Sequence, residues 1–295
     1  MPSEALKAII AAKRAAPDQT ALSIDELRAA SAAAARSIPL PERTKWRPVA
    51  ANDVPCEWID APGVRRDKVF LFIHGGGYYR GSVAISRATA ANIGVATNAR
   101  CLSVDYRLAP EHPYPAAIDD CLAAYRWLLD EGIAATNVVV GGVSAGGGLT
   151  LALLIGARDA GLPLPAAAVA MSAWTDLTQS GESYQTRAEA DPVISKAYLD
   201  HSAHLYLGDA DPLQALASPL FADLSGLPPL LLQVGTAETM MDDSVRFVER
   251  AHEAGVSAVV EPWDDMFHGW HGSAHILPEA QQAIDRIGEF FGQHA

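Results

Sequence analysis

Short apolar runs alternate with helical patterns over most of the chain. Runs at residues 69–73, 100–105 and 138–142 have the length and composition of strands that are buried on both faces. Helical patterns at residues 86–97 and 116–130 separate these runs. Strands that alternate with helices are joined by right-handed crossovers into a mostly parallel sheet.

The same alternation continues through the second half of the chain. The elements that the pattern predicts there are a helix at 145–160, strands at 166–172 and 230–234, a helix at 244–254, a strand at 258–261 and a helix at 279–291. Helices in this arrangement cover both faces of the sheet. We therefore expect an α/β fold built on a mostly parallel central sheet.

Two segments do not fit the alternation. Residues 1–40 contain two helical patterns, the first at 3–15 and the second opening with a capping box at Ser23–Glu26. Residues 180–211 are polar, contain three tyrosines and interrupt the order of strands and helices. We expect a single domain over residues 1–295, in which 1–40 and about 180–211 are cap elements.

Composition narrows the class of partner. The chain has 295 residues, is 49% hydrophobic and carries a formal net charge of −13. It can therefore bury a large core, and its charge would repel phosphate, which argues against a nucleic-acid partner. No apolar run reaches the roughly 18 residues that a membrane span needs. Residues 1–16 lack the uninterrupted apolar segment of a secretory signal, so we predict a cytoplasmic protein.

The strongest chemical motif is G-V-S-A-G at residues 142–146, directly after an apolar run. A serine between small residues, where a strand passes into a helix, is the sequence form of a nucleophile elbow. The turn puts the serine in a strained backbone conformation that only small neighbours tolerate, and it leaves the hydroxyl exposed at the strand end. Ser144 is therefore the candidate nucleophile for acyl transfer.

The candidate general base is His268, in the loop between the last predicted strand and the last predicted helix. His271 and His275 are close to it in sequence, so an alternative interpretation is that the three histidines bind a metal ion. Gly269 and Gly272 argue against a rigid helix that would carry such ligands, and no acidic partner at fixed spacing completes a site. We therefore predict no metal.

The candidate acid comes from the segment after the predicted strand at 230–234. Glu238 lies at the carboxyl end of that strand, and Asp242 and Asp243 follow within about one turn. A carboxylate at a strand end can hold an imidazole in one tautomer and stabilise the imidazolium. Asp242 and Asp243 precede a helix whose N-terminus they would favour. We rank Glu238 first and Asp242 second.

The candidate oxyanion donors lie in H-G-G-G at residues 74–77, after the strand at 69–73. Three glycines allow the backbone to approach a substrate and to direct N–H groups toward developing negative charge. The N–H of Ala145, the residue after the serine, is the second expected contributor. A glycine-rich turn can also cradle phosphate, but neither a P-loop nor a dinucleotide fingerprint is present, so we predict no cofactor.

Four motifs together resemble the hormone-sensitive-lipase branch of the α/β-hydrolase esterases. They are H-G-G-G at 74–77, D-Y-R-L-A-P-E-H-P-Y-P-A at 105–116, G-V-S-A-G-G at 142–147 and F-H-G at 267–269, and the match covers about residues 65–295. The resemblance implies an α/β-hydrolase fold with a helical cap.

The resemblance also implies roles for individual residues. Ser144 would be the nucleophile and His268 the general base and acid. The family's acid lies about thirty residues before the histidine, which points to Glu238. The remaining implied roles are oxyanion donors at Gly76, Gly77 and Ala145, a loop-shaping role for His74 and Gly75, and supporting ion pairs at Asp105, Arg107 and Glu111.

Two positions depart from the family pattern. The family often has aspartate before the nucleophile, where this chain has Val143, so a hydrogen-bonding group is lost but no catalytic atom. The family's acid is commonly aspartate followed by Pro-Leu, where this chain has Glu238, Thr239 and Met240. Because glutamate is one methylene longer, we expect its loop to retract to keep the geometry.

The side chains near the strand ends suggest the size of the substrate. Five large residues flank the predicted site: Tyr78, Tyr79, Trp174, Met240 and Trp270. Side chains of this kind belong more often to the core than to a pocket, but at strand ends they are also compatible with a small apolar acyl site. This favours short to medium acyl esters or lactones over long-chain fat.

These observations predict a carboxylic ester hydrolase. A lactone hydrolase and a small-metabolite deacetylase would use the same triad and stay open. A ligand-binding member that has lost its histidine is opposed by the retention of Ser144 and His268. We expect a small-molecule ester or lactone as partner, no nucleic acid and no membrane span, and the sequence leaves a homodimer open.

Overall fold

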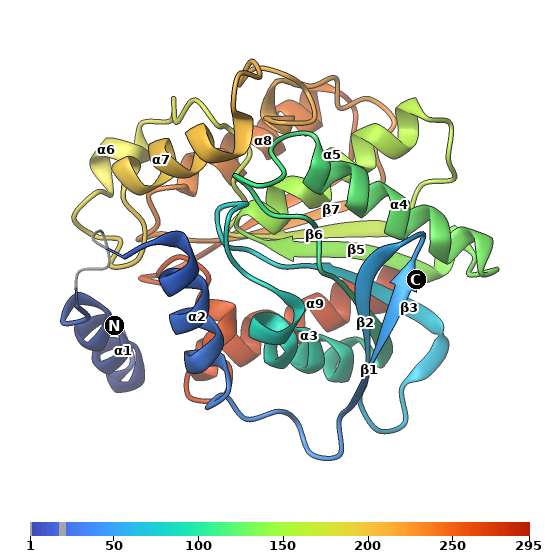
Figure 1. The fold of residues 1–295 in the computed structure, drawn as a ribbon, viewed down its shortest axis with the longest axis horizontal. Coiled ribbons are helices and arrows are strands. Elements are labelled where there is room, and N and C mark those ends of the chain that lie inside the picture. Colours follow the sequence, from blue (N-terminus) through green and yellow to red (C-terminus); the bar gives the residue numbers. More distant parts are fainter. Residues whose placement is uncertain (1, 18–21) are drawn as a thin grey trace.

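The computed structural model describes residues 2–17 and 22–295. Its centre is an eight-stranded sheet in the order β1-β2-β4-β3-β5-β6-β7-β8 (Figure 1). The strands are β1 (Lys45–Ala51), β2 (Val54–Asp60), β3 (Arg65–Ile73), β4 (Ala99–Val104), β5 (Val138–Val143), β6 (Ala167–Met171), β7 (Leu230–Gly235) and β8 (Ala258–Trp263). Only β1 and β2 pair antiparallel with their neighbours, so the prediction of a mostly parallel sheet is confirmed.

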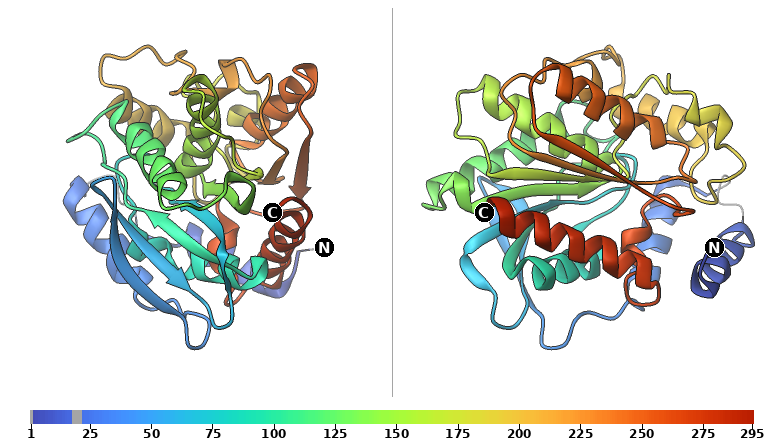
Figure 2. Two further views of the ribbon diagram at one scale, coloured as in Figure 1. Left: turned by 90° about the vertical axis from the view of Figure 1, so that its right-hand side faces the viewer. Right: turned by 180° about the vertical axis from the view of Figure 1, so that it is seen from behind.

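Helices cover both faces of the sheet. The helices are α1 (Glu4–Arg14), α2 (Ile24–Ala35), α3 (Val83–Thr97), α4 (Ala116–Asp130), α5 (Ala145–Asp159), α6 (Ser183–Thr186), α7 (Lys196–Leu207), α8 (Met241–Glu253) and α9 (Pro278–His294). Helices α3 and α9 lie below the sheet in Figure 1, and α4, α5 and α8 lie above it. The view from behind in Figure 2 shows α9 running beneath the strands. The expected α/β fold is confirmed.

The side chains of β3 show how one strand serves both layers. Val69, Leu71 and Ile73 belong to the core cluster shared with α4, α5 and α8. Phe70 and Phe72 belong to the cluster shared with α3 and α9. Successive side chains of a strand point to opposite faces, so a continuous apolar run fills both cores at once. This is the physical basis of the uninterrupted apolar pattern in the sequence.

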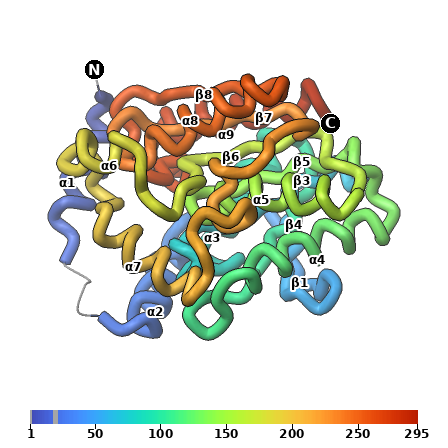
Figure 3. Tube along the Cα trace, turned by 90° about the horizontal axis from the view of Figure 1, so that it is seen from above, coloured from blue at the N-terminus to red at the C-terminus, as the bar shows by residue number. Residues whose placement is uncertain are grey.

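The two segments expected as caps contain helices. Both N-terminal helices begin at the serines that the sequence indicates, and Ser23 forms the complete capping box with Glu26. Residues 180–211 contain α6 and α7, which the sequence pattern did not predict. Seen from above in Figure 3, α1, α2, α6 and α7 lie along one side of the molecule. Residues 1 and 18–21 of the expected N-terminal cap lie outside the described residues.

The first helix is attached to the segment that carries His268. Leu6 is fully buried in a small cluster with Phe267, Trp270 and Leu277. Lys13, in the last turn of α1, places its ammonium 4.7 Å from the centre of the Phe267 ring. In the ranges that the structure covers, we find no helix with both the length and the apolar character required to cross a membrane.

Candidate active site

Four neighbouring parallel strands end at the same edge of the sheet, and a polar residue follows each of them. Ser144 follows β5, Ser172 follows β6, Glu238 follows β7 and His268 follows β8. The carboxyl ends of parallel strands lie side by side, so this topology gathers residues that are far apart in the sequence. The site is built at this edge.

The turn at Ser144 has the geometry of a nucleophile elbow. Ser144 has φ 59° and ψ −123°, a conformation that strains any residue with a Cβ. A Cβ added to Gly142 would lie 2.3 Å from the carbonyl oxygen of Gly146, and one added to Gly146 would lie 2.2 Å from that of Ile73. Larger residues at either position would therefore force the turn apart. The N–H of Ser144 donates to the carbonyl of Met171 at 2.9 Å, which fixes the turn against β6.

Glu238 and His268 form a buried pair. Nδ1 of His268 lies 2.9 Å from Oε2 of Glu238. Glu238 is fully buried, and His268 is 7% exposed. Burial raises the pKa of Glu238, while the hydrogen bond from His268 and the N–H of Gly235 act in the opposite direction. The carboxylate is thus held away from water with the imidazole as its principal charge partner.

The extra methylene of Glu238 is accommodated by its own turn. The side chain folds back so that Oε1 accepts a hydrogen bond from the N–H of Gly235 at 2.7 Å. The N–H of Glu238 donates to the carbonyl of the same glycine at 3.1 Å. A Cβ on Gly235 would lie 2.0 Å from the carbonyl oxygen of Met266, so this turn presses closely against the segment before His268. The additional length of the glutamate is therefore taken up by its side chain, which folds back onto the backbone of Gly235.

Asp242 and Asp243 make different contacts. Oδ2 of Asp242 accepts a hydrogen bond from the N–H of Ser183 at the start of α6, at 2.9 Å. Asp243 is fully buried and accepts from the N–H of Thr175 at 2.7 Å and from the hydroxyl of Tyr184 at 2.7 Å. Both carboxylates hold the cap segment to α8, and neither contacts His268.

Sequence reasoning missed Ser172. It is fully buried, has φ 47°, and its hydroxyl donates to Oε1 of Glu238 at 2.8 Å. The same oxygen accepts from the N–H of Gly269 at 3.1 Å. Its place at the end of the predicted strand 166–172 is a signal that could have drawn attention to it, because the other site residues also follow strands.

The glycine loop passes directly beside Ser144. A Cβ on Gly75 would lie 3.1 Å from the Cβ of Ser144. Gly76 and Gly77 have φ 124° and φ 60°, which side-chain-bearing residues rarely adopt. A Cβ on Gly77 would lie 2.8 Å from the hydroxyl oxygen of Tyr198, in α7. The loop therefore runs between the elbow and the cap helix, where only glycine fits.

His74 shapes this loop from below. Its ring stacks on Tyr106 with centroids 4.2 Å apart, and Nδ1 lies 2.8 Å from the carbonyl oxygen of Gly75. The hydroxyl of Tyr106 donates to the carbonyl of His74 at 3.0 Å. Burial lowers the pKa of His74, so the ring is neutral at ordinary pH. Nε2 lies 3.9 Å from Oδ1 of Asp105, which is the contact that the sequence motif supplies.

The charged residues of the motif at 105–116 are paired. Arg107 donates to both oxygens of Asp120 at the start of α4. Glu111 accepts two hydrogen bonds from Arg28 of α2, at 2.6 and 2.8 Å. Arg28 could not be identified from the sequence, because no motif indicates that it pairs with Glu111, 83 positions away.

Gly269, which follows His268, lies against Val143, which precedes Ser144. A Cβ added to Gly269 would lie 3.7 Å from Cγ1 of Val143. In the described part of the chain, no hydrogen bond joins the hydroxyl of Ser144 to His268. Hydrogen bonds of this kind are often long in unliganded enzymes and tighten when substrate binds. The two loops are therefore adjacent and leave the serine hydroxyl free.

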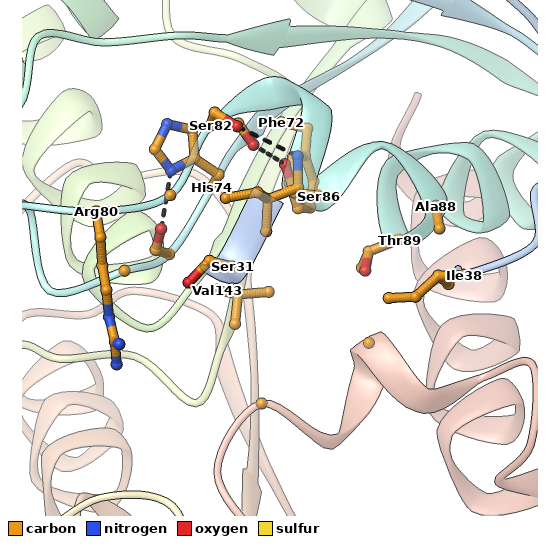
Figure 4. A pocket seen from close by; sticks show the side chains of 16 residues that line it. Ser31, Ile38, Phe72, His74, Arg80, Ser82, Ser86, Ala88, Thr89 and Val143 are labelled. Atoms are coloured by element: carbon orange, nitrogen blue, oxygen red, sulfur yellow. Dashed lines mark hydrogen bonds between the residues drawn. The ribbon is translucent and has the colours of Figure 1, made fainter. Parts of the chain in front are cut away.

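A cavity of about 340 Å³ opens next to these loops. Its walls come from the glycine loop (Gly75, Gly76), the turn before Ser144 (Val143), the loop after His268 (Gly269, Gly272), α2 and the segment after it (Ser31, Ile38), and α3 (Ile85, Ser86, Ala88, Thr89). In Figure 4, Ser31 and Val143 lie between Arg80 at one end and Ile38 with Thr89 at the other. The N-terminal segment therefore forms one wall of the cavity.

The large side chains that flank the predicted site lie in the core, which is the alternative that the sequence favoured for each of them. Tyr78, Trp174, Met240 and Trp270 are buried in the core, and none of them lines the cavity. The Tyr78 ring stacks on Tyr206 with centroids 3.8 Å apart. Tyr79, the fifth of these residues, is 2% exposed. A strand-end position does not determine whether a ring faces the site or packs beneath it.

The three neighbouring histidines have different surroundings. His271 is fully buried, and its Nε2 lies 3.0 Å from Oε1 of Gln233. Burial lowers the pKa of His271 to about 3, and His268 adds to the effect. His275 is exposed. Across residues 2–17 and 22–295, no three His, Cys, Asp or Glu side chains gather into a group that could hold a metal ion.

Comparison with known proteins places the chain in a family. The model of the family described as "alpha/beta hydrolase fold" matches residues 70–272. An acetyl-hydrolase of Streptomyces hygroscopicus is 42% identical over 242 residues, which are 82% of this chain and 81% of that protein. An esterase of Acinetobacter venetianus is 35% identical over 275 residues, covering 93% of this chain and 90% of that protein.

Solved structures agree with this assignment. The crystal structure of an esterase from the bacterial hormone-sensitive lipase family has a TM-score of 0.96 and 46% identity, over 100% of this chain and 99% of that one. EstE5, soaked with p-nitrophenyl butyrate, has a TM-score of 0.94 and 42% identity, over 98% of both chains. The chain belongs to the α/β-hydrolase family, and the resemblance to its hormone-sensitive-lipase branch is confirmed.

Proposed function

We propose that this protein is a serine carboxylesterase that cleaves esters by transferring the acyl group to Ser144. The observation that carries the proposal is the buried contact of 2.9 Å between His268 and Glu238, at the same sheet edge as the strained turn of Ser144. Acyl transfer by serine requires a nucleophile, an oriented base and donors for the oxyanion. The chain brings candidates for all three to this edge.

Each residue then has a defined chemical task. With Glu238 accepting from Nδ1, the imidazole proton stays on Nδ1 and Nε2 is free to accept the proton of Ser144. The serine oxygen attacks the ester carbonyl, and the resulting imidazolium returns its proton to the departing alcohol. A water molecule then repeats the sequence on the acyl-enzyme and releases the acid.

Backbone groups stabilise the charge that develops on the carbonyl oxygen. The proposed donors are the N–H groups of Gly76, Gly77 and Ala145. Ala145 is the first residue of α5, so its N–H belongs to a helix N-terminus, where partial positive charge favours an anion. The close approach of Gly75 to Ser144 supports this arrangement of the loop.

The cavity supports a short to medium acyl group. Its volume of about 340 Å³ lies at the lower end of the range for small-molecule pockets. One relative is named an acetyl-hydrolase, and one solved neighbour was soaked with a butyrate ester. We infer the same preference here, with residues 1–40 and about 180–211 acting as the cap. A cytoplasmic location, a homodimer and the absence of a nucleic-acid partner stay predictions.

A hydrolysis screen tests the proposal. Purified protein would be assayed on p-nitrophenyl esters from acetate to laurate and on a set of lactones, with Ser144→Ala as the control. We expect the highest kcat/KM between acetate and hexanoate, and no activity above background in the variant. Activity that survives in Ser144→Ala would overturn the assignment of Ser144 as the nucleophile. A preference for lactones would identify a lactone hydrolase that uses the same triad.

A further inference from the structure

One hydroxyl group joins the acid to the loop that carries the base. Ser172 donates to Oε1 of Glu238 at 2.8 Å and accepts from the N–H of Gly269 at 3.1 Å. Gly269 directly follows His268. The segments that hold Glu238 and His268 follow β7 and β8, so Ser172, after β6, reaches across to both of them.

Within residues 2–17 and 22–295, three groups donate hydrogen bonds to the Glu238 carboxylate. Oε1 accepts from Ser172 and from the N–H of Gly235, and Oε2 accepts from His268. A carboxyl group with no access to water depends on such donors for its orientation and for its charge. Removal of the Ser172 hydroxyl would leave Oε1 with one donor and would leave the N–H of Gly269 without its acceptor.

The backbone of Ser172 is strained. Its φ of 47° lies in the left-handed region, and the residue is fully buried. Its N–H donates to the carbonyl of Gln233 at 2.7 Å, so neighbouring strand β7 holds it in place. Strain of this kind persists only where the surroundings determine the conformation, and it is concentrated at functional sites. Ser144, which directly follows the adjacent strand, also has a positive φ, of 59°.

We propose that Ser172 is a positioning residue, whose hydroxyl locks the Glu238 carboxylate and the His268–Gly269 backbone into one geometry. This inference rests on the proposed roles of Glu238 and His268. During the reaction the imidazole gains and loses a proton, and its Nδ1 must keep the same partner throughout. A hydroxyl that contacts both segments prevents them from moving apart when the charge of the pair changes.

The proposal predicts a loss in the chemical step and none in binding. Ser172→Ala should lower kcat about ten- to hundredfold, because small misplacement of catalytic groups has effects of this size. KM should stay within about twofold, since Ser172 does not line the cavity. Ser172→Gly accepts φ 47° without strain, so it keeps the fold even if the alanine variant does not. Its kcat should fall by a similar factor.

A second serine provides the matched control. Ser103 of β4 is also fully buried, and its hydroxyl has no hydrogen-bond partner in the part of the chain that the structure describes. Ser103→Ala removes the same atom from a buried strand without touching Glu238 or His268. Its kcat should stay within about twofold of the wild type.

The deciding measurement repeats Ser172→Ala in a Glu238→Gln background. If the hydroxyl acts through the carboxylate, the second substitution should lower kcat less than about twofold there, because residues that act as a unit are not additive. Equal losses in both backgrounds, or wild-type kcat in Ser172→Ala and Ser172→Gly, would overturn the proposal. Failure of the triad itself has a different signature, which is a Glu238→Gln variant as active as the wild type.

Discussion

Arg28 of the second N-terminal helix donates two hydrogen bonds to the carboxylate of Glu111, of 2.6 and 2.8 Å. The same guanidinium donates to the carbonyls of Tyr79 and Ala109, each at 2.9 Å. Tyr79 lies two residues after Gly77 of the glycine loop. Arg28 therefore ties the helix that walls the cavity to the backbone just beyond the proposed oxyanion donors.

Loss of this attachment should weaken both stability and substrate binding. Arg28→Met removes about 1–2 kcal/mol of hydrogen bonding to the two carbonyls, since each such bond contributes about 1 kcal/mol. We expect a fall in Tm of about 2–6 °C and a higher KM, because Ser31 and Ile38 would no longer hold the cavity wall in place. Thermal unfolding and ester kinetics measure the two effects.

Arg28→Lys and an exposed arginine serve as controls for this prediction. Lysine keeps the charge but lacks the planar fork, so it should resemble methionine more than the wild type. Arg126→Met, on the exposed face of α4, should change neither quantity. An unchanged KM in Arg28→Met would show that the attachment has no influence on the site.

Substitution of Glu238 and of Asp242 tests which of the two is the acid that orients His268. Glu238→Gln replaces the carboxylate beside Nδ1 of His268 by a neutral amide, whose NH2 group can face Nδ1 and impose the wrong tautomer, and should lower kcat about ten-thousand-fold, as loss of a triad acid can. Asp242→Asn touches only the hydrogen bond to Ser183, so its kcat should fall no more than a few fold. Steady-state kinetics on one ester decides the order, and the reverse ranking would reassign the acid.

His271 should make the fold sensitive to acid. Its pKa is about 3 in the folded protein, below the reference value of 6.5. The unfolded chain therefore binds a proton at this residue before the folded protein does, and stability falls as the pH drops from about 6.5 toward 3. From pH 7 to about pH 5 this group alone should lower the free energy of unfolding by about 2 kcal/mol.

Urea unfolding at several pH values measures this contribution. In His271→Asn the loss of stability over that interval should be smaller by about the same 2 kcal/mol, although the variant starts from a lower value. His275→Asn, at an exposed position, should behave like the wild type. A pH dependence that is identical in all three proteins would contradict the prediction.

Gly272 offers a way to shorten the cavity. A Cβ there would have only the hydroxyl oxygen of Thr89 nearby, at 3.8 Å, so a side chain can project into the space without a clash. Gly272→Leu should lower kcat/KM on octanoate at least about tenfold more than on acetate. Gly292→Leu, at an open and exposed position of α9, is the matched control. An equal effect on both esters would show that this cavity does not hold the acyl chain.

Most of the central fold could be predicted from the sequence because strands buried on both faces and amphipathic helices leave distinct periods. The helix α7 shows where this fails. Its buried positions include Leu199, Ala203 and Tyr206 at helical spacing, but Ser202 is buried among them and charged or polar residues are interspersed along the helix. The apolar signal is therefore diluted, and the segment could be identified only as an interruption.

Ser144, His268 and the glycine loop could be identified from the sequence because each belongs to a short motif whose residue types are required by the local backbone or by the chemistry. Ser172 and Arg28 do not, since their roles arise only from contacts with residues 66 and 83 positions away. The open choice between core and pocket for Trp174 and Trp270 has a related cause. Position at a strand end constrains the backbone, whereas the direction of a large side chain depends on the packing of helices that the pattern does not locate.

The central claim is that Ser144 forms the acyl-enzyme, and labelling with a fluorophosphonate tests it most directly. Intact-mass spectrometry followed by peptide mapping should find a single adduct, on Ser144, with activity lost in proportion to labelling. Pre-incubation with a short-chain ester should slow the reaction, and Ser144→Ala should remain unlabelled. An adduct on another residue, or full activity in a protein that is completely labelled, would contradict the account.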